Sequence, residues 1–99
     1  MYCVCYAVIT LGQGSYRATN SSDTAPLRRL KNAMTTNYLN YNLYQNTGKT
    51  AIWGNSTNTG VNFTGNGSEQ STSVYGEIPL GQTAPSGDYT DTVTATVTY

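Results

Sequence analysis

The sequence has 99 residues, five basic and five acidic side chains that cancel, and a charged fraction of only 10%. This length allows one domain with a small core. The neutral balance, with no basic cluster beyond Arg28, Arg29 and Lys31, argues against nucleic acid, whose phosphates demand several cations on one face. No stretch is apolar for long enough to span a membrane. Richness in Tyr, Thr, Asn, Ser and Gly is typical of secreted all-β proteins.

The first predicted strand begins almost at the N-terminus, in YCVCYAVITL. Its alternate residues form one face, which consists of Cys3, Cys5, Ala7, Ile9 and Leu11. Met1 is followed at once by this strand, so the sequence shows no signal peptide. We therefore expect residues 1–99 to be a single domain whose natural start lies upstream, within a longer reading frame.

The two cysteines leave two interpretations open. Side chains at positions 3 and 5 of a strand lie about 7 Å apart at roughly 3.3 Å per residue, beyond the usual disulfide span of about 5.5–6 Å. Cys3 and Cys5 are therefore either buried or unpaired thiols, or one of them has lost a disulfide partner with a missing N-terminal segment. The sequence contains no histidine, and a lone C-x-C is a poor metal site.

The next segments are a turn-rich connection and two elements. Residues 12–26 are rich in turn-forming residues. LRRLKNAM (27–34) fits a short helix, because Leu27, Leu30 and Met34 recur at helical spacing, and it fits a short extended segment equally well. YLNYNLY (38–44) predicts a strand with Leu39, Tyr41 and Leu43 inward and with Tyr38, Asn40, Asn42 and Tyr44 outward.

The second half of the chain predicts further strands. AIWG (51–54) is a short strand, residues 55–72 a loop or hairpin tip with a short strand in it, and SVYGEIPL (73–80) a strand limited by Pro79. The last strand alternates strictly, with threonines on one face and the other face formed by Tyr89, Asp91, Val93, Ala95, Val97 and Tyr99. Gly76 and Gly87 are expected at turns or close approaches.

The motifs YLNYNLYQN, WGN, VYGEIPLGQ and GDYTDTVTATVTY stand in an order and spacing that resemble the spore coat protein U domain family. This family includes the pilins of archaic chaperone–usher systems in Gram-negative bacteria. The resemblance runs from about Leu11 to Tyr99 and implies an incomplete immunoglobulin-like β-sandwich of the pilin type. The family's signal peptide, donor segment and early strands have no counterpart in the sequence. Cys5, or Cys3, stands where the family's later cysteine is expected, which implies that its partner lies in the missing segment.

The resemblance implies a structural subunit of a secreted pilus or coat that is completed by donor-strand exchange. The partners would be a periplasmic chaperone and then other subunits, with no membrane insertion. The implied groove for the foreign strand is lined by Val93, Ala95, Val97 and Tyr99. The sequence does not separate a pilus from a spore or cyst coat, or a shaft subunit from a tip subunit.

A second hypothesis is a secreted glycan-binding or tip-adhesin module, in which Trp53, Tyr38 and Tyr44 form an aromatic platform for sugar. An enzyme is not expected, because the sequence has no histidine and its acids form no acid/base pair. We likewise expect no cofactor and no metal. For Arg28 and Arg29, which precede the YNLY strand, we expect a structural hydrogen-bonding role.

Overall fold

The computed structural model describes residues 5–65 and 70–98 of the chain. None of these residues lies in a helix, and the fold is all-β, as predicted. The strands are β1 (Cys5–Leu11), β2 (Arg28–Asn32), β3 (Tyr38–Tyr44), β4 (Val61–Gly65), β5 (Tyr75–Glu77), β6 (Tyr89–Thr90) and β7 (Ala95–Thr98).

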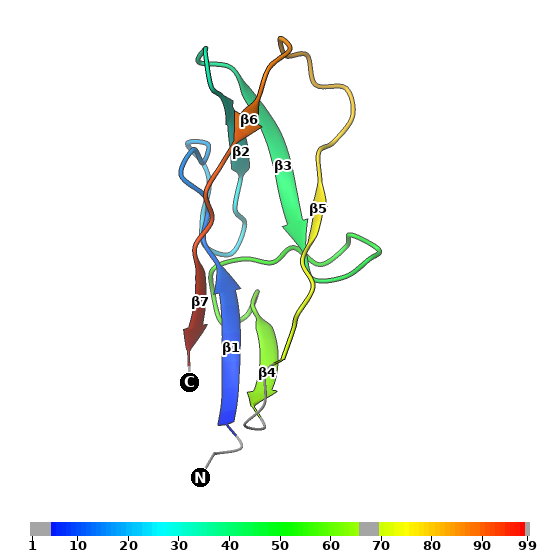
Figure 1. Ribbon diagram of the computed structural model, residues 1–99. Helices are drawn as coiled ribbons and strands as arrows, with labels where there is room; N and C mark the ends of the chain where they lie inside the picture. Colours follow the sequence, from blue (N-terminus) through cyan, green and yellow to red (C-terminus); the bar gives the residue numbers. More distant parts are fainter. Residues whose placement is uncertain (1–4, 66–69, 99) are drawn as a thin grey trace.

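The strands form two antiparallel sheets in a sandwich-like arrangement, consistent with an immunoglobulin-like β-sandwich. One sheet has the order β4-β1-β7 and the other the order β5-β3-β2-β6. The sheets are staggered along the long axis of the molecule, with the first at one end and the second at the other (Figure 1). The radius of gyration is 15.4 Å, against about 13 Å for a compact domain of about 100 residues. Much of the apolar surface that the sheets could cover therefore stays open.

In the second sheet, the segment that fitted both a helix and an extended chain is the extended strand β2, which pairs with β3. The strand predicted at 38–44 is confirmed at the same residues. Tyr41 is buried on the inward face, as expected. The outward placement of Tyr44 is wrong, since it is 8% exposed. The chain folds back beside the end of β3, where Trp53 N–H donates to the Leu43 carbonyl at 2.9 Å.

Five further expectations, for three strands and two glycines, are resolved by the same structure. The predicted strand at 51–54 is reduced to one isolated bridge between Ile52 and Tyr44. The strand at 73–80 shortens to β5, while the short strand expected within 55–72 is present as β4. Gly87 makes a close approach at a φ of 150°, because a side chain there would meet the Asn32 amide. Gly76 makes no such approach, since a Cβ there would have only ordinary contact with Leu43.

The single C-terminal strand expected from Tyr89 onward is in fact two strands. β6 pairs with β2 in one sheet, whereas β7 pairs with β1 in the other. The chain crosses between the sheets at residues 91–94, which belong to neither strand. A period-two pattern records which face a residue occupies and carries no information about a change of sheet.

A buried arginine joins the two sheets. Arg28 on β2 is 1% exposed, and its guanidinium donates to the carbonyls of Leu11 and Gly12, at the end of β1, at 3.0 and 2.9 Å. It also donates to the Trp53 carbonyl at 2.7 Å. Burial lowers the pKa of Arg28, and Tyr41 and Asp91 oppose that shift. The structural role expected for this residue is confirmed.

Replacing Arg28 by methionine keeps the apolar stem of the side chain and removes all three donors. The carbonyls of Leu11, Gly12 and Trp53 would lose charged donors in a largely buried place, so we expect the free energy of unfolding to fall by about 2–4 kcal/mol. Urea unfolding, followed by the fluorescence of Trp53, the single tryptophan, measures the loss.

The control is Arg29→Met in the same strand. The Arg29 guanidinium donates to the Tyr16 and Arg17 carbonyls in an exposed setting, so its loss should cost less than about 1 kcal/mol. Equal losses for the two variants would contradict the role of Arg28 as the link between the sheets.

Candidate functional site

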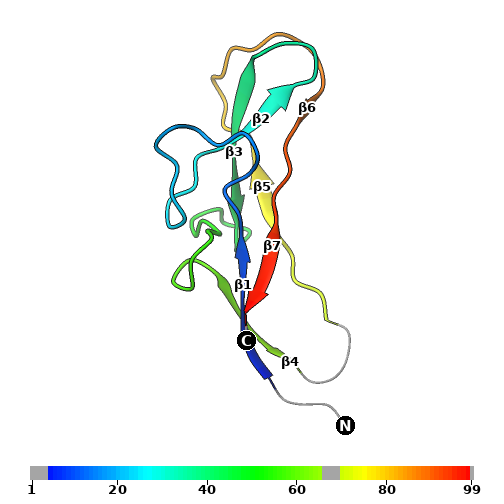
Figure 2. The ribbon, with the colours of Figure 1, turned by 90° about the vertical axis from the view of Figure 1, so that its left-hand side faces the viewer.

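The outer edge of β7 is the first feature of the candidate site. β7 lies at the end of its sheet and pairs only with β1 among the described strands. Figure 2 shows β7 in front of β1, with none of the other described strands beyond it. An unpaired edge presents backbone N–H and C=O groups to any extended segment that approaches.

The second feature is an apolar face that runs across the whole sheet beside that edge. Residues directly opposite one another in an antiparallel pair share a face, so the register assembles one apolar set from three strands, which consists of Ala7, Ile9, Leu11, Val61, Phe63, Ala95 and Val97. Ala7 is buried, whereas Val97 at the open edge is 47% exposed. The face is therefore covered at its centre and uncovered along β7.

The four residues predicted to line a donor-strand groove are not all equivalent in the structure. Ala95 and Val97 lie in β7, side by side with Leu11 and Ile9 of β1. Val93 is half-buried in the crossing segment ahead of β7, and Tyr99 lies outside the described residues. The groove remains a prediction, with Ala95 and Val97 as its members at the open edge.

Asp91 fixes the crossing segment that leads into β7. Its carboxylate accepts hydrogen bonds from the Ser15 N–H at 2.8 Å and from the Thr92 N–H at 2.8 Å, and also from the Tyr41 hydroxyl. Gly14, at a φ of 88°, lies against the same carboxylate, and a side chain there would collide with it. These contacts set where β7 begins.

Sequence reasoning missed this role of Asp91 and Gly14. The available signal was the position of Asp91 in the alternation, because a carboxylate stood on the otherwise apolar face of the expected strand. A charge in such a place needs partners of its own, and two of them, Ser15 and Tyr41, lie far from Asp91 in the sequence.

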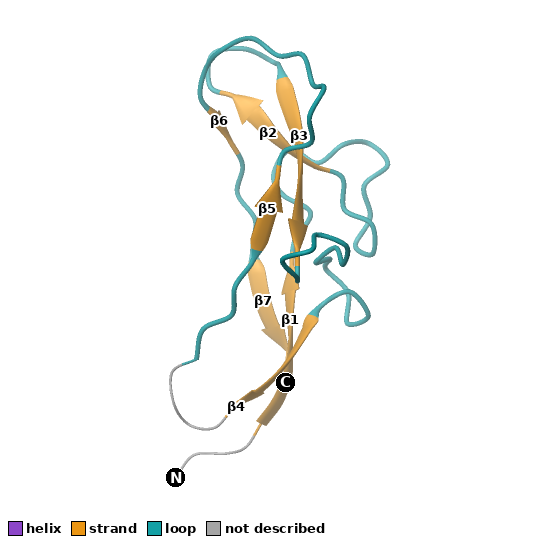
Figure 3. Cartoon of the chain, turned by 90° about the vertical axis from the view of Figure 1, so that its right-hand side faces the viewer, coloured by secondary structure: helices purple, strands orange, loops and turns teal. Residues whose placement is uncertain are grey.

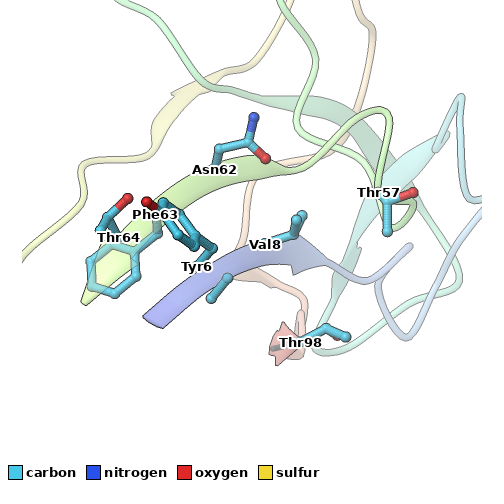
Figure 4. Close-up of a pocket in the computed structure, with 8 residues that line it drawn as sticks. Tyr6, Val8, Thr57, Asn62, Phe63, Thr64 and Thr98 are labelled. Carbon is cyan, nitrogen blue, oxygen red and sulfur yellow. The ribbon is translucent and has the colours of Figure 1, made fainter. Parts of the chain in front are cut away.

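The same sheet holds an open pocket of about 570 Å³ between β1 and β4, lined by residues of both faces that include Ala7 and Phe63. Figure 4 shows Tyr6, Val8, Asn62 and Thr64 along these two strands, with Thr57 and Thr98 at its sides. Among the residues whose side chains the structure describes, its lining includes no carboxylate, imidazole or thiol.

The aromatic residues predicted to contact a glycan do not form one exposed platform. Trp53 is 3% exposed, and its indole N–H donates to the Ile9 carbonyl at 2.9 Å. Tyr44 is buried as well, whereas Tyr38 is partly exposed beneath the guanidinium of Arg29. Because Trp53 and Tyr44 are buried, these three residues do not offer the exposed aromatic surface that binding of a sugar would need.

The remaining site residues can be placed only in part. Cys3 lies outside the described residues, and Cys5 begins β1, with its side chain not described. Within residues 5–65 and 70–98, no group of three or more His, Cys, Asp or Glu side chains could hold a metal ion. In that part of the chain, no helix is long and apolar enough to cross a membrane.

The fold and the open edge define an all-β protein of the immunoglobulin-like sandwich type. The model of the Spore Coat Protein U domain matches residues 3–96, and the chain belongs to this family. The family is a structural one, associated with spore coat or pilus-type proteins of the cell surface, rather than a family of enzymes.

A curated relative supports the same family. The chain is 50% identical, over 93 residues, to Protein U of Myxococcus xanthus. The matched part covers 94% of this chain and 52% of the relative. The chain therefore spans about half the length of Protein U.

The Tyr41–Asp91 contact predicts a loss of stability at alkaline pH. Burial, and next the hydrogen bond to Asp91, raise the pKa of Tyr41 above the usual value of about 10. Above that pH the unfolded chain loses the phenol proton while the folded chain keeps it. The unfolded state then binds fewer protons, so the free energy of unfolding falls as the pH rises.

Tyr41→Phe tests this dependence. The variant should be less stable at neutral pH by about 1–2 kcal/mol, since it lacks the hydrogen bond. Its deficit should shrink between about pH 9 and pH 11, because phenylalanine has no proton to lose. Urea unfolding at several pH values gives the deficit directly, and a deficit that stays constant across this range would exclude the mechanism.

Proposed function

We propose that this chain is a structural subunit of a secreted bacterial surface fibre or coat, and that it accepts a strand from another molecule at the outer edge of β7. The observation that carries the proposal is the combination of an unpaired edge with an uncovered apolar face at the same strand. An added strand would bond to the backbone of β7 and lay alternate side chains beside Val97. Backbone hydrogen bonds supply affinity in this mode of recognition, and pockets for alternate side chains supply specificity.

The free energy expected from inserting a strand is large enough to matter for a subunit that is completed by its neighbour. Four or five apolar side chains, at about 1.5–3 kcal/mol each, would contribute roughly 6–15 kcal/mol on insertion. The net stability of a whole domain is about 5–15 kcal/mol. The core here is small, with buried apolar side chains at Ala7, Tyr41, Tyr44 and Trp53 among the described residues. A strand from outside could therefore supply a large share of the stability.

The proposed partners follow from this mode of assembly. A periplasmic chaperone of the archaic chaperone–usher type would occupy the edge first, and an extended segment of another subunit would replace it at the cell surface. Support comes from membership of the Spore Coat Protein U domain family. The 50% identity to Protein U of Myxococcus xanthus supports a coat as an equally suitable setting.

A charge at position 97 tests the proposed edge. Val97→Lys would place an ammonium group among the apolar side chains of the inserted strand, where it would lose hydration without a counter-charge. With the chain secreted into the periplasm of a Gram-negative host together with an archaic-type chaperone, the wild type should co-purify with the chaperone. The Val97→Lys variant should lose at least 90% of that recovery (roughly tenfold, or about 1.4 kcal/mol).

The matched control is Thr96→Lys, which adds the same charge to the same strand on the face opposite Val97, where Thr96 is paired with Thr10. It should keep most of the wild-type recovery. Hydrogen exchange of the β7 amides gives a second readout, because chaperone binding should slow exchange at residues 95–98. Retention of Val97→Lys, or unchanged exchange on binding, would overturn the assignment.

A further inference from the structure

A cluster of cations and tyrosine rings lies on one face of the second sheet. Arg29 and Lys31 are two residues apart in β2, so their side chains lie on the same face. They are paired with Asn40 and Tyr38 of β3, and paired residues share a face. Tyr16, in the loop after β1, adds a second ring whose centroid is 6.4 Å from that of Tyr38. These five residues are called the basic face below.

The guanidinium of Arg29 is held in place by backbone acceptors and by a ring. Its Nε donates to the Tyr16 carbonyl at 2.8 Å and its Nη2 to the Arg17 carbonyl at 3.2 Å. Its Cζ lies 4.0 Å from the centroid of the Tyr38 ring. Among the described residues, these contacts leave Nη1 without an acceptor. A guanidinium that is already positioned can offer this nitrogen to a carboxylate with little further loss of side-chain freedom.

The hydrogen bonds of the two cations end on neutral oxygens in the described part of the chain. Lys31 Nζ donates to the carbonyls of Asn32 and Thr35, and Arg29 also donates to carbonyls. Glu77 shares this face but stands on β5, with β3 between it and both cations. Two positive charges, on Cα positions about 7 Å apart at roughly 3.3 Å per residue, therefore attract a ligand with repeated negative charges.

The basic face lies on paired strands rather than at an open edge. β2 lies between β3 and β6, and β3 lies between β5 and β2. Figure 3 shows β2 with β3 on one side and β6 on the other. An extended peptide would find no free edge of backbone N–H and C=O groups on these two strands and could not add to them as a further strand.

The tyrosines of the basic face suit a sugar ligand. Tyr38 is the member of the predicted aromatic platform that stays partly exposed, at 36%, and Tyr16 beside it is 37% exposed. An aromatic ring offers an apolar surface to the C–H groups of a sugar ring and carries a polar hydroxyl at its tip. The amide of Asn40, an exposed residue, can donate to and accept from sugar hydroxyls.

We infer that the basic face binds an acidic polysaccharide, a chain of sugars that carry carboxylate groups. Arg29 Nη1 and Lys31 would bind the carboxylates, and the rings of Tyr16 and Tyr38 would pack against the sugars. This site lies on the second sheet, so it does not depend on strand addition at β7. It would attach a surface fibre or coat to polysaccharide around the cell.

The experiment titrates the full chain with hexagalacturonate, an oligosaccharide of uronic acids, by calorimetry at low ionic strength. Maltohexaose supplies sugar rings without carboxylates, and hexaglutamate supplies carboxylates without sugar rings. Both should bind at least tenfold more weakly than hexagalacturonate. Added salt should weaken the binding of hexagalacturonate, because it screens exposed charges. In amide NMR spectra, the signals of β2 and β3 should shift on binding, whereas those of β7 should not.

Three variants test the assignment of residues. Arg29→Met should weaken hexagalacturonate binding at least tenfold. Tyr16→Leu should weaken it at least threefold, because it removes the ring and keeps the backbone carbonyl that Arg29 contacts. The matched control is Lys49→Met, which removes a cation after the end of β3, outside the basic face, and should change the affinity less than twofold. Circular dichroism and Trp53 fluorescence confirm that each variant is folded before titration.

The inference is overturned if hexagalacturonate does not bind, or if maltohexaose or hexaglutamate binds equally well. It is overturned as well if Arg29→Met and Lys49→Met lose the same affinity, or if Tyr16→Leu binds like the wild type. The last result would mean that the face attracts any anion through charge alone.

Discussion

The arrangement of the two sheets depends on the hydrogen bonds of one buried guanidinium. Arg28 is the largest side chain that is fully buried in the described residues, and it bonds to carbonyls at the end of β1 and at Trp53. A buried charge is tolerated only where its donors are satisfied. Since Arg28 stands on β2 and two of its acceptors, Leu11 and Gly12, lie at the end of β1 in the other sheet, satisfying this charge also fixes how the sheets meet.

Asp91 provides a second link between the sheets, at the start of the segment in which the chain crosses from β6 to β7. Its carboxylate draws together Tyr41 of β3 and the N–H of Ser15 in the loop after β1, so the chain leaves β6 in one sheet and enters β7 in the other. The GQ and YTDT motifs therefore contain residues that maintain the architecture. The Gln82 side chain hydrogen-bonds to the backbone N–H and carbonyl of Asn40 in β3. Asp91 accepts a hydrogen bond from the Ser15 N–H and so fixes the segment that leads into β7. These structural roles account for the presence of Gln82 and Asp91 in the sequence motifs without a role in ligand binding.

Local alternation predicted the features that depend on one strand at a time. It gave the bounds of β3, the apolar face that carries Ala95 and Val97, and the presence of β4. It failed for Tyr44, whose burial arises from the chain reversal after β3 that brings Trp53 beside this strand. Nor could it order the strands within a sheet, because edge positions depend on pairings between distant segments, such as β1 with β7.

The chemistry of the β7 edge distinguishes it from an edge that is built to stay solvent-exposed. Native sheets protect their edges with lysine, proline, bulges or inward charges. Residues 95–98 are Ala, Thr, Val and Thr, with none of these devices. The β5 segment differs, because Glu77 and Pro79 limit what can pair along it. β7 is therefore the edge whose sequence places fewer restrictions on a pairing strand.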